Sequence, residues 1–148
     1  MPEEETLERA EEDKREGKAA STQAGEFVRE EIEHVREGKH GARSTKQAIA
    51  IGLSKARRAG VNLPPPKKGK ASKKTREQAS GDIRKGKSAG KGKKSAKRSR
   101  ATLGALKREG HSAGSKKALS LHARSAAAKR SAASRSRSAK KAAATRKK

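Results

Sequence analysis

Apolar residues recur at helical spacing in two neighbouring parts of the chain. Val28, Ile32 and Val35 stand four and then three positions apart, which is the spacing of one face of an α-helix. The segment STKQAIAIGLSKARRAG, residues 44 to 60, has apolar residues along one helix face, while its Lys and Arg lie off that face or cluster at its C-terminal end. The pattern predicts a small helical hairpin over about residues 22 to 60, because each stripe needs a partner to be stable. The side chains expected to pack in it are Phe27, Val28, Ile32, Val35, Ile49, Leu53 and Ala56.

Residues that begin and end helices flank these stripes. Ser44 followed by Gln47 has the spacing of a capping box, in which the Ser oxygen accepts from a backbone N–H and Gln47 reaches back. Gly60 fits a left-handed stop, after which Val61 would pack back onto Ala56. The expected helix stops are Gly17, Gly38 and Gly60.

The supply of large apolar side chains is small. Leu, Ile, Val and Phe together number 15 of 148 residues, and Trp and Tyr are absent. Such a composition with high net charge is typical of chains that cannot bury enough apolar surface to fold. The predicted fold class is therefore a mostly disordered chain with α-helical segments, containing the small hairpin and a low-complexity basic tail.

Composition divides the chain into five expected segments. They are an acidic N-terminal helical segment (1–21), the helical hairpin (22–63), a basic flexible linker (64–98), a second, weaker helical hairpin (99–130) and a basic disordered tail (131–148). The second hairpin rests on an internal echo, since VREGKHGARSTKQAIAIGLSKAR resembles KREGHSAGSKKALSLHARSAAAKR further along. Chance repetition in a biased sequence is the alternative explanation.

Charge is distributed unevenly along the chain. The net charge is +25, but residues 1–37 carry 13 acidic and 6 basic side chains, whereas residues 67–148 carry 29 basic and 3 acidic ones. A cationic field of this density binds polyanions by releasing counterions. The residues expected to contact nucleic acid are Lys55, Arg57, Arg58, Lys67, Lys68, Lys70, Lys73, Lys74, Arg84, Lys85, Lys93, Lys94, Lys97, Arg98, Arg100, Lys116, Lys117, Arg124, Lys129, Arg130, Arg135, Arg137, Lys140, Lys141, Arg146, Lys147 and Lys148.

Several function classes find no support in the sequence. Cysteine is absent, which excludes disulfides and thiolate chemistry but does not indicate a compartment. No apolar run is long enough to span a membrane, and the acidic start of the sequence lacks the apolar stretch of a signal peptide, so we expect a cytoplasmic protein that does not act at a membrane. His34 and His40 do not have a metal-ligand spacing, and His111 and His122 lie far from them. No Ser is placed beside a His as a nucleophile would be. We therefore expect no enzyme activity, no cofactor and no metal.

Two resemblances add to this interpretation. The segment EFVREEIEHVREGKHGARSTKQAIAIGLSKARRAG resembles an uncharacterised family of small basic bacterial proteins whose helical hairpin carries KQAIAIALSEAR, and it departs from that form at Gly52 and Lys55. This resemblance implies the hairpin and a bacterial origin, but no activity. The tail, with SAKRS, AAKRSAA and SAKKAAATRKK, resembles linker-histone tails and the Lys/Ala-rich extensions of bacterial histone-like proteins. That resemblance implies compaction or bridging of DNA.

The sequence thus favours a non-enzymatic, histone-like, nucleoid-associated protein that binds double-stranded DNA largely without sequence preference. The hairpin would pair within the chain or form a homodimer that brings two tails together. The alternatives are a hydrophilic, disordered, stress-protective protein and a protein that binds structured RNA or the ribosome. The lack of aromatic residues disfavours stacking on single-stranded bases.

Overall fold

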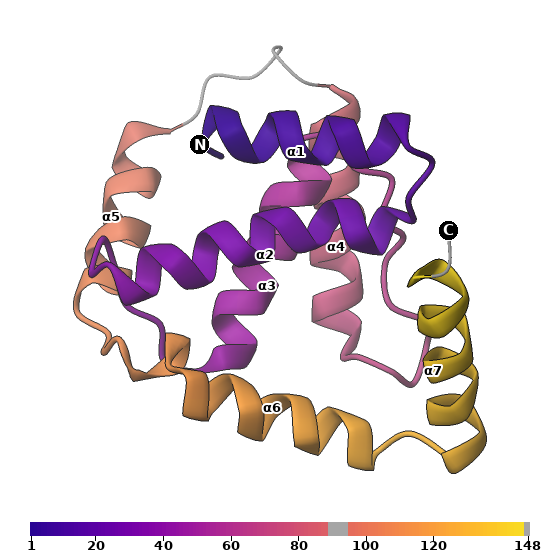
Figure 1. Ribbon diagram of the computed structural model, residues 1–148. Coiled ribbons are helices and arrows are strands. Elements are labelled where there is room, and N and C mark those ends of the chain that lie inside the picture. The colour runs from indigo at the N-terminus through magenta and orange to yellow at the C-terminus, as the bar shows by residue number, and fades with distance from the viewer. Residues whose placement is uncertain (89–94, 147–148) are drawn as a thin grey trace.

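A computed structural model describes residues 1–88 and 95–146, and these form seven α-helices, one short 3₁₀-helix and no β-strand. The elements are α1 (Glu4–Arg15), α2 (Ala20–Arg36), α3 (Thr45–Arg58), α4 (Lys73–Lys87), α5 (Ala96–Lys107), η1 (Ser112–Gly114), α6 (Lys116–Ala128) and α7 (Ala132–Arg146). Figure 1 shows α1 to α4 gathered in a packed body, with α5, α6 and α7 arranged around its edge.

The prediction of a mostly disordered chain, and with it the description as intrinsically disordered, is wrong. The described residues are largely helical, and the helices bury a core in which alanine is the commonest residue. Alanine loses no rotamer freedom on burial and lets backbones approach closely, so a core of this kind needs few large side chains. The buried alanines are Ala10, Ala24, Ala42, Ala48, Ala56, Ala79 and Ala113.

The two helices expected from apolar periodicity correspond to α2 and α3, and they cross (Figure 1). Gly52 lies at the crossing, where a Cβ would stand 2.6 Å from the Cα of Val28. On one side of the crossing Phe27 packs with Ala56, and on the other Val35 packs with Ala48. The remaining predicted packing residues are buried or half-buried: Ile32 is buried, and Val28, Ile49 and Leu53 are half-buried.

The predicted helix ends are largely confirmed. Ser44 Oγ accepts from the Gln47 backbone N–H at 3.2 Å, although the Gln47 side chain accepts from the Arg43 N–H (2.7 Å) and not from Ser44. Gly60 has a φ of 97°, and the next residue, Val61, donates to the Ala56 carbonyl at 3.1 Å, which is a Schellman cap. The two other expected stops also have left-handed backbones, with φ values of 72° at Gly17 and 75° at Gly38.

The segment expected to be a flexible linker contains α4, which packs against α3. Asp82 of α4 is buried and accepts from Ser54 Oγ at 2.6 Å and from Arg58 Nε at 2.7 Å. Gly86 allows the close approach, since a Cβ there would stand 2.2 Å from the Arg57 carbonyl oxygen. A basic segment with one large apolar residue is thus held by a buried carboxylate and by a glycine contact.

We predict that Asp82→Asn lowers the free energy of unfolding by about 2 kcal/mol at pH 7, because bonds to charged groups contribute about 1.5–3 kcal/mol each. Burial acts to raise the pKa of Asp82, but Ser54 and Arg58 outweigh it and the pKa is lowered below 3.8. The stabilisation is therefore complete above about pH 4 and is lost as the pH falls through the folded-state pKa. Urea unfolding at pH 7 and pH 3 measures this, with exposed Glu77→Gln as the control. Equal stability of the Asp82 variant and the parent at pH 7 would contradict it.

The segment before α6, which resembles the loop before α3 in sequence, is hydrogen-bonded to α2 and α3. His111 Nδ1 donates to the Val35 carbonyl at 3.1 Å, and Arg36 Nε donates to the Gly114 carbonyl at 2.6 Å. Thr45 Oγ1 donates to Ala113 O at 2.7 Å. These bonds fix η1 against α2 and α3, so the start of α6 is attached to the body.

Candidate functional site

The C-terminal helices carry a dense set of exposed cations. Residues 95–146 contain fifteen Lys and Arg and a single acidic residue, Glu109. All fifteen cations are exposed, and α5, α6 and α7 contain no buried residue. Within the described residues, no carboxylate lies within 4 Å of any of them, since the ion pairs all involve residues before position 95. We call α5, α6, α7 and their connections, residues 95–146, the cationic helices. Their positive charges have no acidic partner among the described residues.

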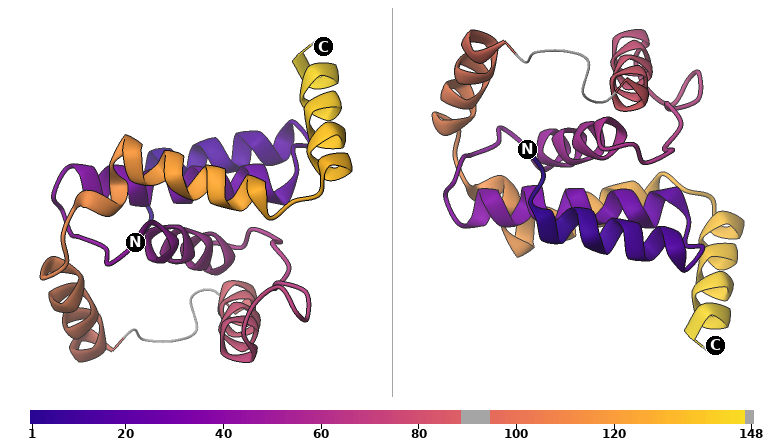
Figure 2. Two further views of the ribbon diagram at one scale, coloured as in Figure 1. Left: turned by 90° about the horizontal axis from the view of Figure 1, so that it is seen from below. Right: turned by 90° about the horizontal axis from the view of Figure 1, so that it is seen from above.

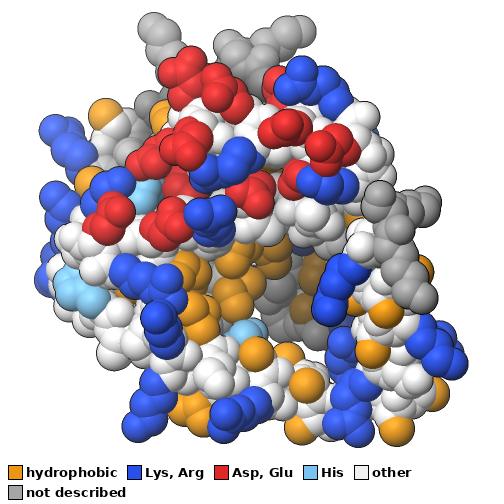
Figure 3. Space-filling view, in the orientation of Figure 1, with side chains coloured by type: hydrophobic (Ala, Val, Ile, Leu, Met, Phe, Trp, Pro, Cys, Tyr) orange, Lys and Arg blue, Asp and Glu red, His pale blue; other side chains and the backbone are white. Residues whose placement is uncertain are grey.

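Acidic residues occupy a different part of the molecule. In Figure 3 the Asp and Glu side chains gather over α1 and α2, whereas the part formed by α6 and α7 shows Lys and Arg. The views in Figure 2 show α7 extending beyond the end of α6, away from the packed body. Opposite charges are thus separated in space as well as along the sequence.

Most of the residues predicted to contact nucleic acid lie on exposed surface. Exposed positions on and before α4 are Lys67, Lys68, Lys70, Lys73, Lys74, Arg84 and Lys85. Exposed positions on the cationic helices and their connections are Lys97, Arg98, Arg100, Lys116, Lys117, Arg124, Lys129, Arg130, Arg135, Arg137, Lys140, Lys141 and Arg146. Lys93, Lys94, Lys147 and Lys148 lie outside the described residues.

Three predicted contact residues are instead engaged within the fold. Arg57 is buried, and its guanidinium donates to the carbonyls of Leu63 (3.1 Å) and Pro64 (3.4 Å). Arg58 pairs with Asp82, although half of its side chain remains exposed. Lys55 is held by two buried carboxylates. We therefore leave Lys55 and Arg57 out of the candidate interface, because neither side chain is free to reach a phosphate.

Lys55 connects α3 to two buried carboxylates of α2. Its Nζ lies 3.0 Å from Glu30 Oε1 and 2.7 Å from Glu31 Oε2, and both Glu side chains are 1% exposed. Burial acts to lower the pKa of Lys55, but Glu31 and Glu30 outweigh it and raise the pKa above 10.5. Burial likewise acts to raise the pKa of Glu30, but the backbone N–H of Glu3 and the Lys55 ammonium outweigh it and lower the pKa below 4.5.

Two histidines lie beside these carboxylates. His40 Nε2 is 3.0 Å from Glu31 Oε1, and His34 Nε2 is 2.9 Å from Glu3 Oε1. The hydrogen bond from His34, followed by that from Lys39, lowers the pKa of Glu3 to about 2. Donor atoms of Glu31, His34 and His40 all lie within 4.8 Å of one another.

The sequence interpretation missed this cluster. In the sequence His34 and His40 lie six positions apart across a predicted helix end, which is not a metal-ligand spacing. The left-handed backbone of Gly38 (φ 75°) reverses the chain and brings His40 back toward α2. The available signal was Glu31 and His34 at i and i+3 on one face, followed by a glycine stop and a second histidine.

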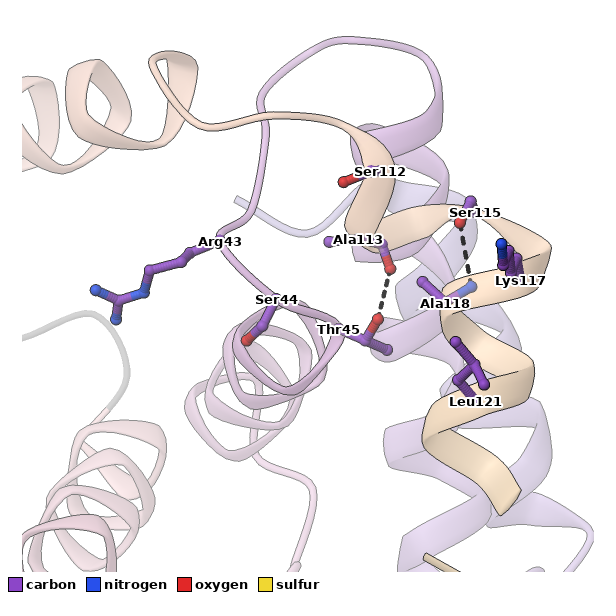
Figure 4. A pocket seen from close by; sticks show the side chains of 9 residues that line it. All are labelled: Arg43, Ser44, Thr45, Ser112, Ala113, Ser115, Lys117, Ala118 and Leu121. Carbon is purple, nitrogen blue, oxygen red and sulfur yellow. Dashed lines mark hydrogen bonds between the residues drawn. The ribbon is translucent and has the colours of Figure 1, made fainter. Parts of the chain in front are cut away.

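A shallow pocket of about 310 Å³ lies where α6 leaves the packed body (Figure 4). Its lining includes Ser44 and Ser115, the caps of α3 and α6, together with Arg43 and Lys117. Figure 4 shows Arg43 pointing away from the side chains of α6. The pocket therefore places two helix N-termini near each other at the edge of the cationic helices.

The comparisons with known proteins concern the first part of the chain. Among the described residues, no helix has the length and apolar character that crossing a bilayer requires. Neither the curated proteins nor the solved structures include a match. Residues 12–68, which include α2, α3 and the Glu31–His40 cluster but not the cationic helices, match the model of a family of unknown function (DUF6496).

Proposed function

We propose that this chain binds double-stranded DNA through the cationic helices, by neutralising backbone phosphates and with little sequence preference. The observation that carries the proposal is the set of fifteen exposed cations on residues 95–146, which have no carboxylate partner among the described residues. Each such side chain that reaches a phosphate releases a condensed counterion, and this release is the main source of non-specific affinity for DNA.

The residue types argue against base-specific reading. The chain contains one aromatic residue, Phe27, which is buried and therefore cannot stack on a base. Ser and Ala dominate between the cations of α7. Such a surface positions a duplex through its phosphates and carries few groups that would distinguish base edges.

The acidic residues of α1 and α2 would orient the chain relative to the DNA duplex. Phosphates are repelled from that part of the molecule and attracted to the cationic helices, so the duplex would meet one side of the chain. Binding of this kind would make the protein nucleoid-associated. It would be histone-like because it neutralises phosphate charge, and the proposal does not include wrapping of DNA around the protein.

The other sequence-based hypotheses are less well supported. The disordered, stress-protective alternative depended on a disordered chain, and the helices remove that basis. A dimer through the apolar faces of α2 and α3 is not part of the proposal, because these faces are buried against each other within one chain. Structured RNA offers the same phosphate chemistry and is used below as a competing probe.

We predict that the double variant Arg135→Gln with Arg137→Gln, both on exposed positions of α7, weakens duplex binding and flattens its salt dependence. The slope of log K against log salt should fall in magnitude by up to about 2, since each phosphate contact contributes about 0.9. Fluorescence anisotropy with a labelled duplex measures both effects, and a structured RNA hairpin serves as competitor.

The matched control is Lys14→Gln with Arg15→Gln, which removes the same charge from exposed positions at the end of α1. The control should keep the parent slope. Equal losses in the two variants would mean that only net charge matters and would reject the assignment to the cationic helices. Stronger binding to the RNA hairpin than to the duplex would transfer the proposal to RNA.

A further inference from the structure

Three side chains of types that can bind a metal ion converge where α2 meets the loop before α3. Glu31 and His34 lie one turn apart on α2, and His40 comes from the loop. One donor atom from each lies within 4.8 Å of the other two. The side chains are shielded from solvent, with exposed fractions of 1% for Glu31, 12% for His34 and 9% for His40. Two imidazoles and a carboxylate are a common donor set for Zn²⁺.

The hydrogen bonding of His40 leaves one of its nitrogens directed at an anion. Its Nδ1 lies 3.0 Å from the Gly41 carbonyl oxygen, which can only accept, so Nδ1 carries a proton. In a neutral ring Nε2 then presents a lone pair, and it lies 3.0 Å from Glu31 Oε1. Two lone pairs at that distance require a cation or a second proton between them.

Glu31 points to the same requirement. Both of its carboxylate oxygens are buried, and neither receives a hydrogen bond of acceptable geometry among the described residues. Oε2 lies 2.7 Å from the Lys55 ammonium, whereas Oε1 lies 3.0 Å from His40 Nε2. An unsatisfied buried carboxylate oxygen is costly unless an unseen partner completes it.

The surroundings resemble the outer shell of a metal site. Ligating histidines usually donate their other nitrogen to a carbonyl or a carboxylate; His40 donates to the Gly41 carbonyl, and His34 donates to Glu3 at 2.9 Å. The two rings meet edge to face, with centroids 5.9 Å apart.

Charge balance also favours a bound cation. Four carboxylates, those of Glu3, Glu30, Glu31 and Glu37, share two ammonium groups, those of Lys39 and Lys55. Carboxylates therefore outnumber ammonium groups in the cluster, and a divalent cation would offset the excess of negative charge.

We propose that Glu31, His34 and His40 bind one Zn²⁺ ion, with a fourth coordination position available to water. The site contains no residue of the cationic helices, so Zn²⁺ binding and DNA binding can be tested separately. It would fasten the loop after α2 to the helix and add to the stability of the body.

Isothermal titration calorimetry of the full chain, stripped with EDTA and dialysed, tests the proposal with ZnCl₂ as the titrant. We expect one ion per chain, and no heat from MgCl₂, since Mg²⁺ prefers oxygen ligands alone. His34→Gln and His40→Gln should each weaken Zn²⁺ binding by at least about tenfold. His122→Gln on α6, outside the cluster, is the control and should bind as the parent does.

A second measurement on the native chain covers the case in which a variant fails to fold. Imidazole ¹⁵N chemical shifts recorded during Zn²⁺ addition should change for His34 and His40, and stay constant for His111 and His122. No binding by the native chain would overturn the site and leave an imidazolium–carboxylate pair as the explanation. Shifts confined to His111 or His122 would overturn it as well.

Discussion

Replacing Lys55 with Met should lower the free energy of unfolding by about 3–5 kcal/mol, because breaking a buried ion pair leaves an uncompensated charge in the interior. The ammonium lies between the buried carboxylates of Glu30 and Glu31, 3.0 and 2.7 Å away. Methionine has a similar length and keeps the packing, so the loss reports on charge. Urea unfolding followed by circular dichroism at neutral pH measures it.

The control is Lys46→Met, which alters an exposed lysine of the same helix and should change stability by less than about 0.5 kcal/mol. Adding Glu31→Gln to Lys55→Met should restore part of the loss by removing one buried charge. A Lys55 variant as stable as the Lys46 variant would contradict the role given to the cluster.

The pH dependence of this stabilisation has two limits. Because the pKa of Glu30 is lowered in the fold, its contribution is complete above about 4.5 and is lost as the pH falls through the folded-state pKa. Because the pKa of Lys55 is raised, its contribution is complete below 10.5 and is lost as the pH rises through the folded-state pKa. The difference between the parent and Lys55→Met should therefore be largest between these limits.

Gly52→Val should cost about 3 kcal/mol, at the upper end of overpacking effects. A Cβ at this position would stand 2.6 Å from the Val28 Cα and 2.9 Å from the Phe27 carbonyl oxygen. Backbone atoms cannot move aside as a flexible side chain can. The helices α2 and α3 must therefore separate, which exposes the apolar contacts on both sides of their crossing. The thermal midpoint, measured by circular dichroism, should fall accordingly.

Gly25→Val is the matched control, since Gly25 lies within α2 and a Cβ there meets no atom within 4 Å. It should leave stability unchanged or raise it slightly, because glycine is a poor helix former. Equal midpoints for the two variants would show that α2 and α3 do not cross closely at Gly52.

Local features of the fold could be predicted from the sequence. Ser44, Gly38 and Gly60 mark helix ends because capping and left-handed glycine depend on neighbouring residues alone. The apolar spacing of Val28, Ile32 and Val35 identified the buried face of α2, because periodicity maps directly onto a helix face.

The extent of folding could not be predicted, because the features responsible are not visible in composition. Ala56 and Ala113 count little in a tally of apolar residues, yet both belong to the core. Glycine lowers helix propensity, yet Gly52 and Gly86 lie within helices at positions where the backbone of a neighbouring helix leaves no room for a Cβ. Asp82 holds α4 through partners in α3 that sequence spacing does not indicate.

For the candidate sites, the sequence located the cationic side chains but not the roles of all of them. The sequence predicts Lys55 and Arg57 as surface cations at a helix end. In the structure Lys55 pairs with buried carboxylates some 25 positions earlier, and Arg57 donates to carbonyls of the loop that follows its own helix. His40 joins Glu31 and His34 only because the chain reverses at Gly38. Sequence separation does not reveal such contacts.

The salt dependence of duplex DNA binding by the full chain is the most direct test of the central claim, that the cationic helices form a phosphate-binding surface. Anisotropy titrations between about 50 and 200 mM NaCl should give a log–log slope of about −5 or steeper, as expected for six or more phosphate contacts. Duplexes of unrelated sequence should bind with similar affinity. Absence of binding at the lowest salt, or an affinity that does not change with salt, would contradict the claim.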